Sequence, residues 1–322
     1  MELVWSGAAP ASVTDRDLVS PARGRFAVLP SNVEATQLAE RVLGGECRFA
    51  LIVGPGGTGK THLLEAVAAR ARVAVVRAGD LSHAKQSASD GLLVLDDVEA
   101  ISGQSKLAIQ ARILLERRVR AKRPVIAAAA TGGIPATKLV PFSRVWRLAS
   151  IEPPSGDERV VLLNEMCANL GIALPPGAAR LTSRTVTGDG RTLRGALTRL
   201  RVAAREELAS ASLVNIAGWL FPYAQASGSY DLRDIVFDAV CRAGGSGPRR
   251  LTCSELQSLA AYLLRVHAEL PEGAIAEYFG ACGGEVFRCV ERVRKRLAVG
   301  ERAMTAAARR AMAFIQERLC DR

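Results

Sequence analysis

The sequence lacks the residue patterns that mark metal-binding, disulfide-rich and membrane-spanning proteins. Its seven cysteines form no Cys-x-x-Cys pair and its three histidines lie near no pair of cysteines, so we expect reduced thiols in a cytoplasmic protein and no zinc site. The start of the chain has neither the basic nor the apolar segment of a signal peptide. The longest uncharged stretch, residues 208–230, contains serine, asparagine, glycine and proline. We interpret it as a helix end and a linker rather than a membrane span.

An excess of one charge sign is the main compositional feature of the chain. Of its 322 residues, 49% are hydrophobic and 23% are charged, a balance that excludes a fully disordered or fibrous protein. The length allows about two domains of roughly 150 residues each. Lysine and arginine outnumber aspartate and glutamate by 43 to 32, which gives a formal net charge of +11. A strongly basic chain favours an anionic partner such as nucleic acid, a nucleotide or a membrane surface.

Short apolar runs alternate with helical patterns between residues 49 and 151. The runs lie at 49–53, 73–76, 91–95, 125–130 and 146–151. Strands that are apolar throughout are typical of a parallel sheet covered on both faces. After the Pro153-Pro154 pair only helical patterns follow, and we find no internal repeat. We therefore predict an α/β domain with a parallel sheet, followed by an all-α region.

A complete phosphate-binding loop lies between the first apolar run and a helical pattern. It matches G-x-x-x-x-G-K-[ST] with the residues Gly54, Pro55, Gly56, Gly57, Thr58, Gly59, Lys60 and Thr61. Glycines let successive backbone N–H groups face a phosphate, and the start of the following helix favours the same anion. We expect Lys60 to contact the outer phosphates and Thr61 to bind Mg²⁺, so ATP and Mg²⁺ are the predicted ligands.

Two adjacent carboxylates complete the expected site. Asp96 and Asp97 follow the apolar run at 91–95, where the end of a neighbouring strand would bring them beside the phosphate loop. We expect Asp96 to hold Mg²⁺, directly or through water, and Asp97 to orient or activate the attacking water. Taken alone, two aspartates after a strand more often form a turn or a helix cap. Their pairing with the loop favours the catalytic interpretation.

The amino-acid sequence around these motifs resembles that of the AAA+ ATPases of the DnaA family, which includes the bacterial replication initiator and its regulatory relative Hda. The segments that carry the resemblance are Gly59-Lys60-Thr61-His62-Leu63-Leu64 and Leu92-Leu93-Val94-Leu95-Asp96-Asp97. The resemblance implies that His62 lies at the nucleotide and that Asn32 belongs to a box on the adenine side. It also implies that Arg144 is the arginine finger for a neighbouring subunit and that Arg191 is the sensor II residue. At sensor I, Thr131 is the only polar side chain able to serve.

The resemblance extends to the organisation of the whole chain. It implies an N-terminal extension (1–25), an α/β nucleotide-binding domain of the AAA+ P-loop type (26–152), a helical lid (153–210), a linker (211–230), a helical module like the helix-turn-helix DNA-binding domain of the initiator (231–300) and a C-terminal helix (301–322). Two departures stand out. The segment between 76 and 91 is too short for the initiator's helical insertion, as in Hda, and the Arg-Asp-His-Thr-like signature of the DNA-binding domain is replaced by Ala281-Cys-Gly-Gly-Glu285.

Loss of that signature changes the expected contact with DNA. An arginine can read guanine through two hydrogen bonds, which cysteine and glycine cannot do. The densest basic patch of the C-terminal part consists of Arg288, Arg292, Arg294, Lys295 and Arg296. The plain interpretation is a solvated helix face, and the functional one is contact with DNA phosphates without sequence reading. The expected partners are ATP or ADP, non-specific DNA and, for assembly, the replication initiator, the clamp or further copies of the chain, but no membrane.

Two other functions fit part of the pattern. A helicase loader or transposition helper of the DnaC or IstB type shares the Gly-Lys-Thr-His motif, although the sensor II sequence and the C-terminal tail argue against it. A DNA-binding scaffold that does not hydrolyse ATP is the other alternative. It is favoured by the alanines at 127–130 before Thr131, which make weak hydrolysis the expectation if hydrolysis occurs.

Overall fold

The computed structural model describes residues 19–20, 24–83, 91–101, 106–131, 140–204, 208–245 and 250–321. The chain divides into two compact units, Met1–Pro154 and Ser155–Arg322. The first unit is α/β and the second is entirely helical in its described part.

A five-stranded parallel sheet forms the centre of the first unit. Its strands lie in the order β4-β5-β6-β3-β7, and every neighbouring pair is parallel. The strands are β3 (Phe49–Gly54), β4 (Val75–Arg77), β5 (Leu93–Asp96), β6 (Val125–Ala130) and β7 (Arg147–Ser150). The predicted parallel sheet is therefore confirmed. A separate antiparallel pair joins β1 (Val19–Ser20) to β2 (Gly24–Arg25).

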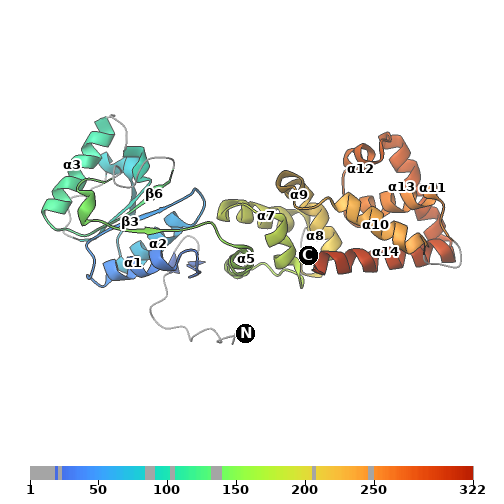
Figure 1. Cartoon of the computed structure of the whole chain (residues 1–322), viewed down its shortest axis with the longest axis horizontal. Helices are drawn as coiled ribbons and strands as arrows, with labels where there is room; N and C mark the ends of the chain where they lie inside the picture. The colour runs from blue at the N-terminus through green and yellow to red at the C-terminus, as the bar shows by residue number, and fades with distance from the viewer. Residues whose placement is uncertain are drawn as a thin grey trace, which may run out of the picture. The chain divides into compact units, whose positions relative to one another are not determined.

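Helices cover both faces of this sheet (Figure 1). On one face, α1 (Val33–Leu43) and α2 (Lys60–Ala71) share a core with Ala50 and Ile52 of β3. On the other face, α3 (Lys106–Arg120) shares a core with the alternate β3 residues, such as Leu51. Alternate side chains of one strand thus enter two cores, which is why the strand is apolar at every position. Short 3-10 helices span Ala78–His83 (η1), Val98–Ile101 (η3) and Ser143–Val145 (η4).

The second unit is built from helices that share one continuous core. They are α5 (Gly156–Leu170), α6 (Ala178–Thr185), α7 (Gly190–Ala203), η5 (Leu208–Ser210), α8 (Leu213–Trp219), α9 (Phe221–Ser227), α10 (Leu232–Gly245), α11 (Cys253–Val266), α12 (Glu272–Phe279), α13 (Gly283–Ala298) and α14 (Arg302–Asp321). Capping boxes start several of them: Ser155 pairs with Glu158 at α5 and Thr252 with Glu255 at α11. This single core contains buried residues from Leu163 in α5 to Leu319 in α14.

The segment expected to be a linker, residues 211–230, is folded instead. It forms α8 and α9, and the side chains of Val214, Ile216 and Leu220 are fully buried in the shared core. Its lack of charge therefore reflects burial against other helices. None of the helices in the described residues combines the length and the apolar character that crossing a bilayer requires.

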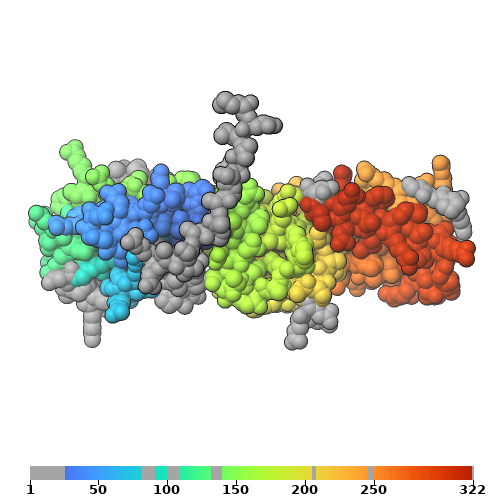
Figure 2. Space-filling model, turned by 90° about the horizontal axis from the view of Figure 1, so that it is seen from below, coloured from blue at the N-terminus to red at the C-terminus, as the bar shows by residue number. Residues whose placement is uncertain are grey.

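The C-terminal helix α14 lies along the surface of the second unit, where its residues form the red area of Figure 2. Its inner face places Met304, Ala307, Ala311, Ile315 and Leu319 in the shared core at helical spacing. The guanidinium of Arg310 also donates a hydrogen bond of 2.9 Å to the carbonyl of Ala243 in α10. The last helix is thus packed into the core of this unit.

Candidate functional site: a phosphate loop with two carboxylates

The phosphate loop connects β3 to α2, and its shape depends on glycine at particular positions. Gly57 and Gly59 have positive φ angles of 74° and 101°, a region that favours glycine. At Gly54 the constraint is space, because a Cβ there would lie 2.3 Å from the carbonyl oxygen of Ile151. Thr58 closes the turn by donating its hydroxyl hydrogen to the carbonyl of Pro55 at 3.0 Å. The loop is a compact turn that opens α2.

Lys60, the first residue of α2, is almost fully buried, with 9% of its surface exposed. Its ammonium group donates hydrogen bonds to the carbonyls of Gly54 at 2.7 Å and Pro55 at 2.6 Å. A buried ammonium needs such partners because desolvation of an uncompensated charge is costly. The side chain therefore lies across the loop that the motif assigns to phosphate.

The magnesium ligands expected from the sequence lie in direct contact. The hydroxyl of Thr61 donates a hydrogen bond of 2.7 Å to one carboxylate oxygen of Asp96, at the end of β5. The other oxygen of Asp96 accepts the backbone N–H of Asp97 at 3.0 Å. Only 3% of Asp96 is exposed. A hydroxyl and a carboxylate are oxygen ligands of the kind that Mg²⁺ uses together with nucleotide phosphates, so this pair fits the ion.

Asp97 differs from its neighbour in exposure and in backbone conformation. Its side chain is exposed and its φ angle of 55° turns the chain away from β5. Partial desolvation, followed by the charges of Asp96 and Glu99, raises the pKa of Asp97 above its ordinary value. Arg77 and Lys60 act in the opposite direction. The expected role of Asp97 in orienting or activating water therefore stays a prediction.

Glu99 is a residue that the sequence reasoning missed. From the short helix η3, its carboxylate accepts a hydrogen bond of 2.9 Å from the backbone N–H of Ala130, at the end of β6. The next residue, Thr131, donates its backbone N–H to the carbonyl of Gly54 at 3.2 Å. Glu99 therefore ties the turn that carries Asp97 to the strand end where sensor I is expected. Only the register of β5, β6 and η3 brings these residues together.

Asn32 and His62 have structural contacts on the α1 side of the sheet. Asn32 is buried, and its amide accepts the N–H of Leu29 and donates to the carbonyl of Ala27, both at 2.9 Å. His62 packs edge-on against Phe26, with ring centroids 5.2 Å apart. Asn32 thus shapes the segment before α1, and contact of either residue with a nucleotide remains a prediction.

The predicted arginine finger, Arg144, and the predicted sensor II residue, Arg191, are both exposed and belong to different units. Arg144 lies in η4, flanked by the exposed side chains of Phe142 and Val145. Arg191 lies in the first turn of α7, where Asp189 caps the helix. Since Arg191 belongs to the second unit, its contact with a nucleotide in the first unit stays a prediction, as does the action of Arg144 on a neighbouring subunit.

The basic patch of α13 is divided between exposed and paired side chains. Arg288, Arg292 and Lys295 are exposed, and we call these three residues the basic row. Arg296 is held between two carboxylates, Glu255 at 2.8 Å and Glu301, and these ion pairs raise its pKa. Arg296 is therefore better explained as a structural residue that joins α11, α13 and the start of α14 than as a DNA contact.

Arg294, the remaining residue of the patch, forms an ion pair with Glu291 one turn earlier on α13. Both side chains reach the surface, with 59% of the Arg294 side chain and 30% of the Glu291 side chain exposed. A surface pair of this kind stabilises a helix only weakly. A phosphate could compete for Arg294, so the predicted DNA contact is retained for this residue and for the basic row.

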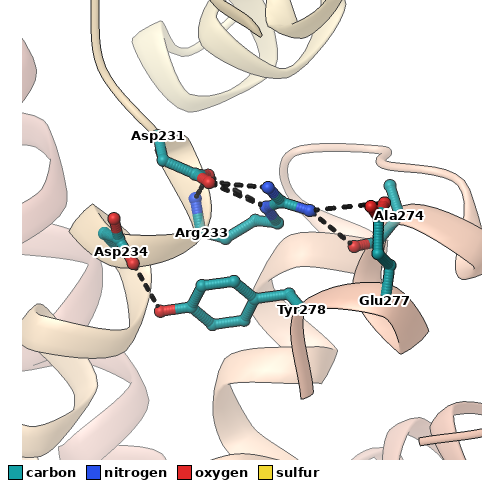
Figure 3. Close-up of polar contacts among 6 residues, drawn as sticks. All are labelled: Asp231, Arg233, Asp234, Ala274, Glu277 and Tyr278. Carbon is teal, nitrogen blue, oxygen red and sulfur yellow. Dashed lines mark hydrogen bonds and ion pairs between the residues drawn. The ribbon is translucent and has the colours of Figure 1, made fainter. Parts of the chain in front are cut away.

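A second polar cluster fixes α12 against α10 (Figure 3). Arg233 bonds to the carboxylate of Asp231 at 2.7 Å and donates to the carbonyl of Ala274 at 3.1 Å. Glu277 lies 3.8 Å from the same guanidinium. Burial alone would raise the pKa of Asp231, but the hydrogen bonds and charge of Arg233 outweigh it and lower that pKa. This cluster lies within the second unit and holds it together.

Aromatic rings complete the polar cluster. Arg233 lies over the rings of Phe221 and Tyr278, at 5.3 Å and 5.2 Å from their centroids. The hydroxyl of Tyr278 donates to Asp234 at 2.7 Å, and burial together with this bond raises the pKa of Tyr278. The helices α9, α10 and α12 thus meet at one guanidinium.

Comparison with known proteins identifies the fold of the chain and a partial sequence likeness. No family model matches the chain. The chromosomal replication initiator protein DnaA of Acinetobacter baylyi is 27% identical over 179 residues, which are 48% of this chain and 38% of that protein. The match therefore spans well under half of the relative's length.

Solved structures show the same likeness. Domain III of DnaA from Thermotoga maritima aligns with a TM-score of 0.52 at 19% identity, over 62% of this chain and 95% of that chain. AMPPCP-bound DnaA from Aquifex aeolicus aligns with a TM-score of 0.48 at 18% identity, over 92% of this chain and 96% of that chain. The alignment with domain III shows the AAA+ fold, and the resemblance to DnaA-like AAA+ proteins expected from the sequence is confirmed.

Proposed function

We propose that this chain, a DnaA-like protein with the AAA+ fold, binds ATP with Mg²⁺ and acts in the initiation of DNA replication or in its regulation. The observation that carries the proposal is the contact between Thr61 and Asp96 beside Lys60. A hydroxyl, a carboxylate and an ammonium group lie next to a loop in which Gly57 and Gly59 have positive φ angles, and such glycine conformations let successive backbone N–H groups face an anion. Polyphosphate and a divalent cation are the ligands that need all of these groups at once.

The residues of the loop suggest a division of labour in nucleotide binding. Lys60 would exchange the carbonyls of Gly54 and Pro55 for the outer phosphates of ATP. Thr61 and Asp96 would hold Mg²⁺, which neutralises phosphate charge when bound. Asp97, exposed at the end of the same turn, would accept a proton from the attacking water or orient it.

Assembly and DNA contact extend the proposal beyond the nucleotide. Arg144 would reach the nucleotide of a neighbouring copy, since an arginine supplied by a partner can stabilise charge in phosphoryl transfer. The basic row of α13 would contact DNA phosphates. The replication initiator, the clamp or further copies of the chain would be the protein partners. The AAA+ fold and the partial likeness to DnaA support this interpretation.

Equilibrium binding of a fluorescent ATP analogue tests the nucleotide site. Lys60→Ala should abolish detectable binding, because the variant removes the only ammonium group that the motif directs at the phosphates. Lys122→Ala, which removes an exposed lysine at the end of α3, is the matched control and should bind like the unmodified chain. Wild-type affinity in the Lys60 variant would show that the site assignment is wrong.

Steady-state ATP turnover and size-exclusion chromatography test the role of Arg144. Arg144→Ala should leave ATP affinity unchanged but reduce hydrolysis or ATP-dependent assembly. Arg147→Ala, an exposed arginine at the start of β7, is the control. Equal loss of ATP binding in the Arg144 variant would point to a defect in folding.

A binding protein without turnover is the second candidate. The strand end before Thr131 consists of alanines, and Glu99 bonds to its backbone. Tight ATP binding with no turnover, in the presence of DNA and of the initiator, would favour this scaffold function.

A further inference from the structure

The exposed side of α13 carries an aromatic ring beside the basic row. The side chain of Phe287 is 56% exposed and presents its ring to solvent. Arg288, Arg292 and Lys295 follow at the i, i+4, i+7 spacing of one helix face. Phe287 directly precedes Arg288, about 100° away around the helix, so the ring lies on the neighbouring face, which it shares with Glu291 and Arg294.

A surface pocket opens next to the ring. Its volume is about 270 Å³, just under the ~300 Å³ at which pockets for drug-sized ligands begin. Val266 at the end of α11 and Phe287 supply apolar walls. Two ion pairs, Arg265 with Glu272 and Arg294 with Glu291, form its polar walls. The pocket therefore suits a flat group of one or two rings with polar edges.

The start of α13 is poorly suited to reading duplex DNA. In the first turn, Gly283 and Gly284 have no side chain that could reach a base edge. Glu285 already accepts the backbone N–H of Cys282 at 2.9 Å as part of a helix cap. The major-groove reading expected of a recognition helix is thus missing, while the ring and the cations lie one turn further along.

The position of α13 is firmly set by its neighbours. Arg296 anchors the helix to Glu255 of α11 and to Glu301 before α14. Its partner helix α12 is in turn fixed to α10 by the Arg233 cluster (Figure 3). A ring displayed on a fixed helix loses little conformational entropy when a ligand stacks on it.

We propose that this face of the second unit binds single-stranded DNA, with one base stacked on Phe287 in the adjoining pocket and the flanking phosphates on the basic row. The combination of an exposed ring with a track of cations is how proteins bind unpaired strands without reading their sequence. A duplex keeps its bases stacked inside and could use only the cations. This site deepens the DNA contact of the proposed function and rests on that part of it.

Fluorescence anisotropy of a labelled oligothymidylate tests the proposal with the full chain in the absence of nucleotide. Phe287→Ala should weaken binding about 5- to 150-fold, the equivalent of 1–3 kcal/mol per stacked base. Phe287→Trp should bind at least as tightly as the unmodified chain. Phe287→Leu, which keeps an apolar side chain but has no ring, should behave like Phe287→Ala. Val299→Ala is the matched control, because Val299 is an apolar residue at the end of α13 that is 82% exposed.

The basic row has a different signature in the same assay. Arg288→Ala combined with Arg292→Ala should reduce the slope of log affinity against log salt by roughly 0.7 per lost phosphate contact. Phe287→Ala should leave that slope unchanged. A duplex of the same length should bind more weakly than the single strand and should not respond to Phe287→Ala.

Three outcomes would overturn the proposal. They are an unchanged affinity in Phe287→Ala, full affinity in Phe287→Leu, or a duplex that binds at least as tightly as the single strand. ATP binding measured in parallel separates this result from the nucleotide site, because Phe287→Ala should bind ATP normally. In the Lys60→Ala background, which should not bind ATP, Phe287→Ala should still weaken the binding of single-stranded DNA.

Discussion

The two units of the chain differ in how their buried or half-buried charged groups are paired. In the first unit, Lys60 and Asp96 bond to backbone carbonyls, to a hydroxyl and to a backbone N–H. In the second unit, Arg233 and Arg296 bond mainly to carboxylates of the same unit. A neutral partner can be exchanged for phosphate or Mg²⁺. Removing one member of a buried pair of opposite charges, by contrast, strongly destabilises the fold. We therefore expect Lys60 and Asp96 to serve a ligand and Arg233 and Arg296 to serve stability.

The largest expected effect tests whether the second unit is one cooperative body. A Cβ at Gly218 in α8 would lie 1.8 Å from the backbone carbonyl oxygen of Ala268, which follows α11. Gly218→Ala should therefore lower the free energy of unfolding by about 3 kcal/mol or more, since backbone cannot move aside cheaply. Thermal unfolding followed by circular dichroism measures it.

A glycine in open space is the control for this variant. A Cβ at Gly273 in α12 would have no neighbouring atom of the described residues within 4 Å, so Gly273→Ala should change stability by at most about 1 kcal/mol, in the stabilising direction. If Gly218→Ala unfolded only part of the helical signal, the unit would contain two independent bodies and the comparison would need three regions.

The next effect addresses the Arg233 cluster. Arg233→Ala should lower the free energy of unfolding by about 2–3 kcal/mol, because it leaves Asp231 without its cation and removes the contact with two rings. ATP affinity should stay the same. Arg242→Ala, which disturbs an exposed pair with Asp238, should cost under about 0.5 kcal/mol. Weakened ATP binding in the Arg233 variant would show that the charged pairs of the second unit also affect the nucleotide site.

Asn32 tests the reverse case, a buried polar group of the first unit that bonds to backbone. Asn32→Ala should lower the free energy of unfolding by about 1–2 kcal/mol, since the N–H of Leu29 and the carbonyl of Ala27 lose their partner. Asn32→Asp keeps the acceptor for Leu29 but turns a buried carboxylate oxygen toward the carbonyl of Ala27, so it should cost at least as much. Denaturant unfolding gives the stability, and the fluorescent ATP analogue shows whether nucleotide affinity falls with it. A stable Asn32→Ala variant would show that the segment before α1 is held in another way.

The smallest expected effect concerns Glu99. Glu99→Ala should cost about 1 kcal/mol of stability through the lost bond to Ala130, and it should slow ATP turnover several-fold while the affinity for ATP stays within about twofold. Glu99→Gln keeps an acceptor oxygen and should fall between the unmodified chain and Glu99→Ala. Unchanged turnover in both variants would restrict Glu99 to a structural role.

Sequence reasoning was most successful where the relevant residues are close in the chain. The phosphate loop and the Asp96-Asp97 pair can be found because glycine, lysine and carboxylate occur at set spacings beside apolar strands. The contact between Thr61 and Asp96 needs one further step, that parallel strands end at the same edge of a sheet. The parallel sheet itself follows from strands that are apolar at every position.

Features that depend on distant contacts could not be predicted from the sequence. Glu99 meets Ala130 only through the register of the sheet. The uncharged segment at 211–230 could be a linker or a buried helix pair by composition, and only the surrounding helices decide between them. By sequence, Arg292 and Arg296 are equivalent members of the basic patch. Only the ion pair of Arg296 with Glu255, which is distant in the chain, gives Arg296 a structural role.

The two carbonyl bonds of Lys60 also set a threshold for what the loop can bind. An incoming anion must replace bonds to Gly54 and Pro55, and bonds that involve a charged group contribute about 1.5–3 kcal/mol each. A single phosphate ion offers little beyond that exchange. A nucleoside triphosphate would add contacts along the loop and through Mg²⁺, so we expect Lys60 to discriminate against small anions.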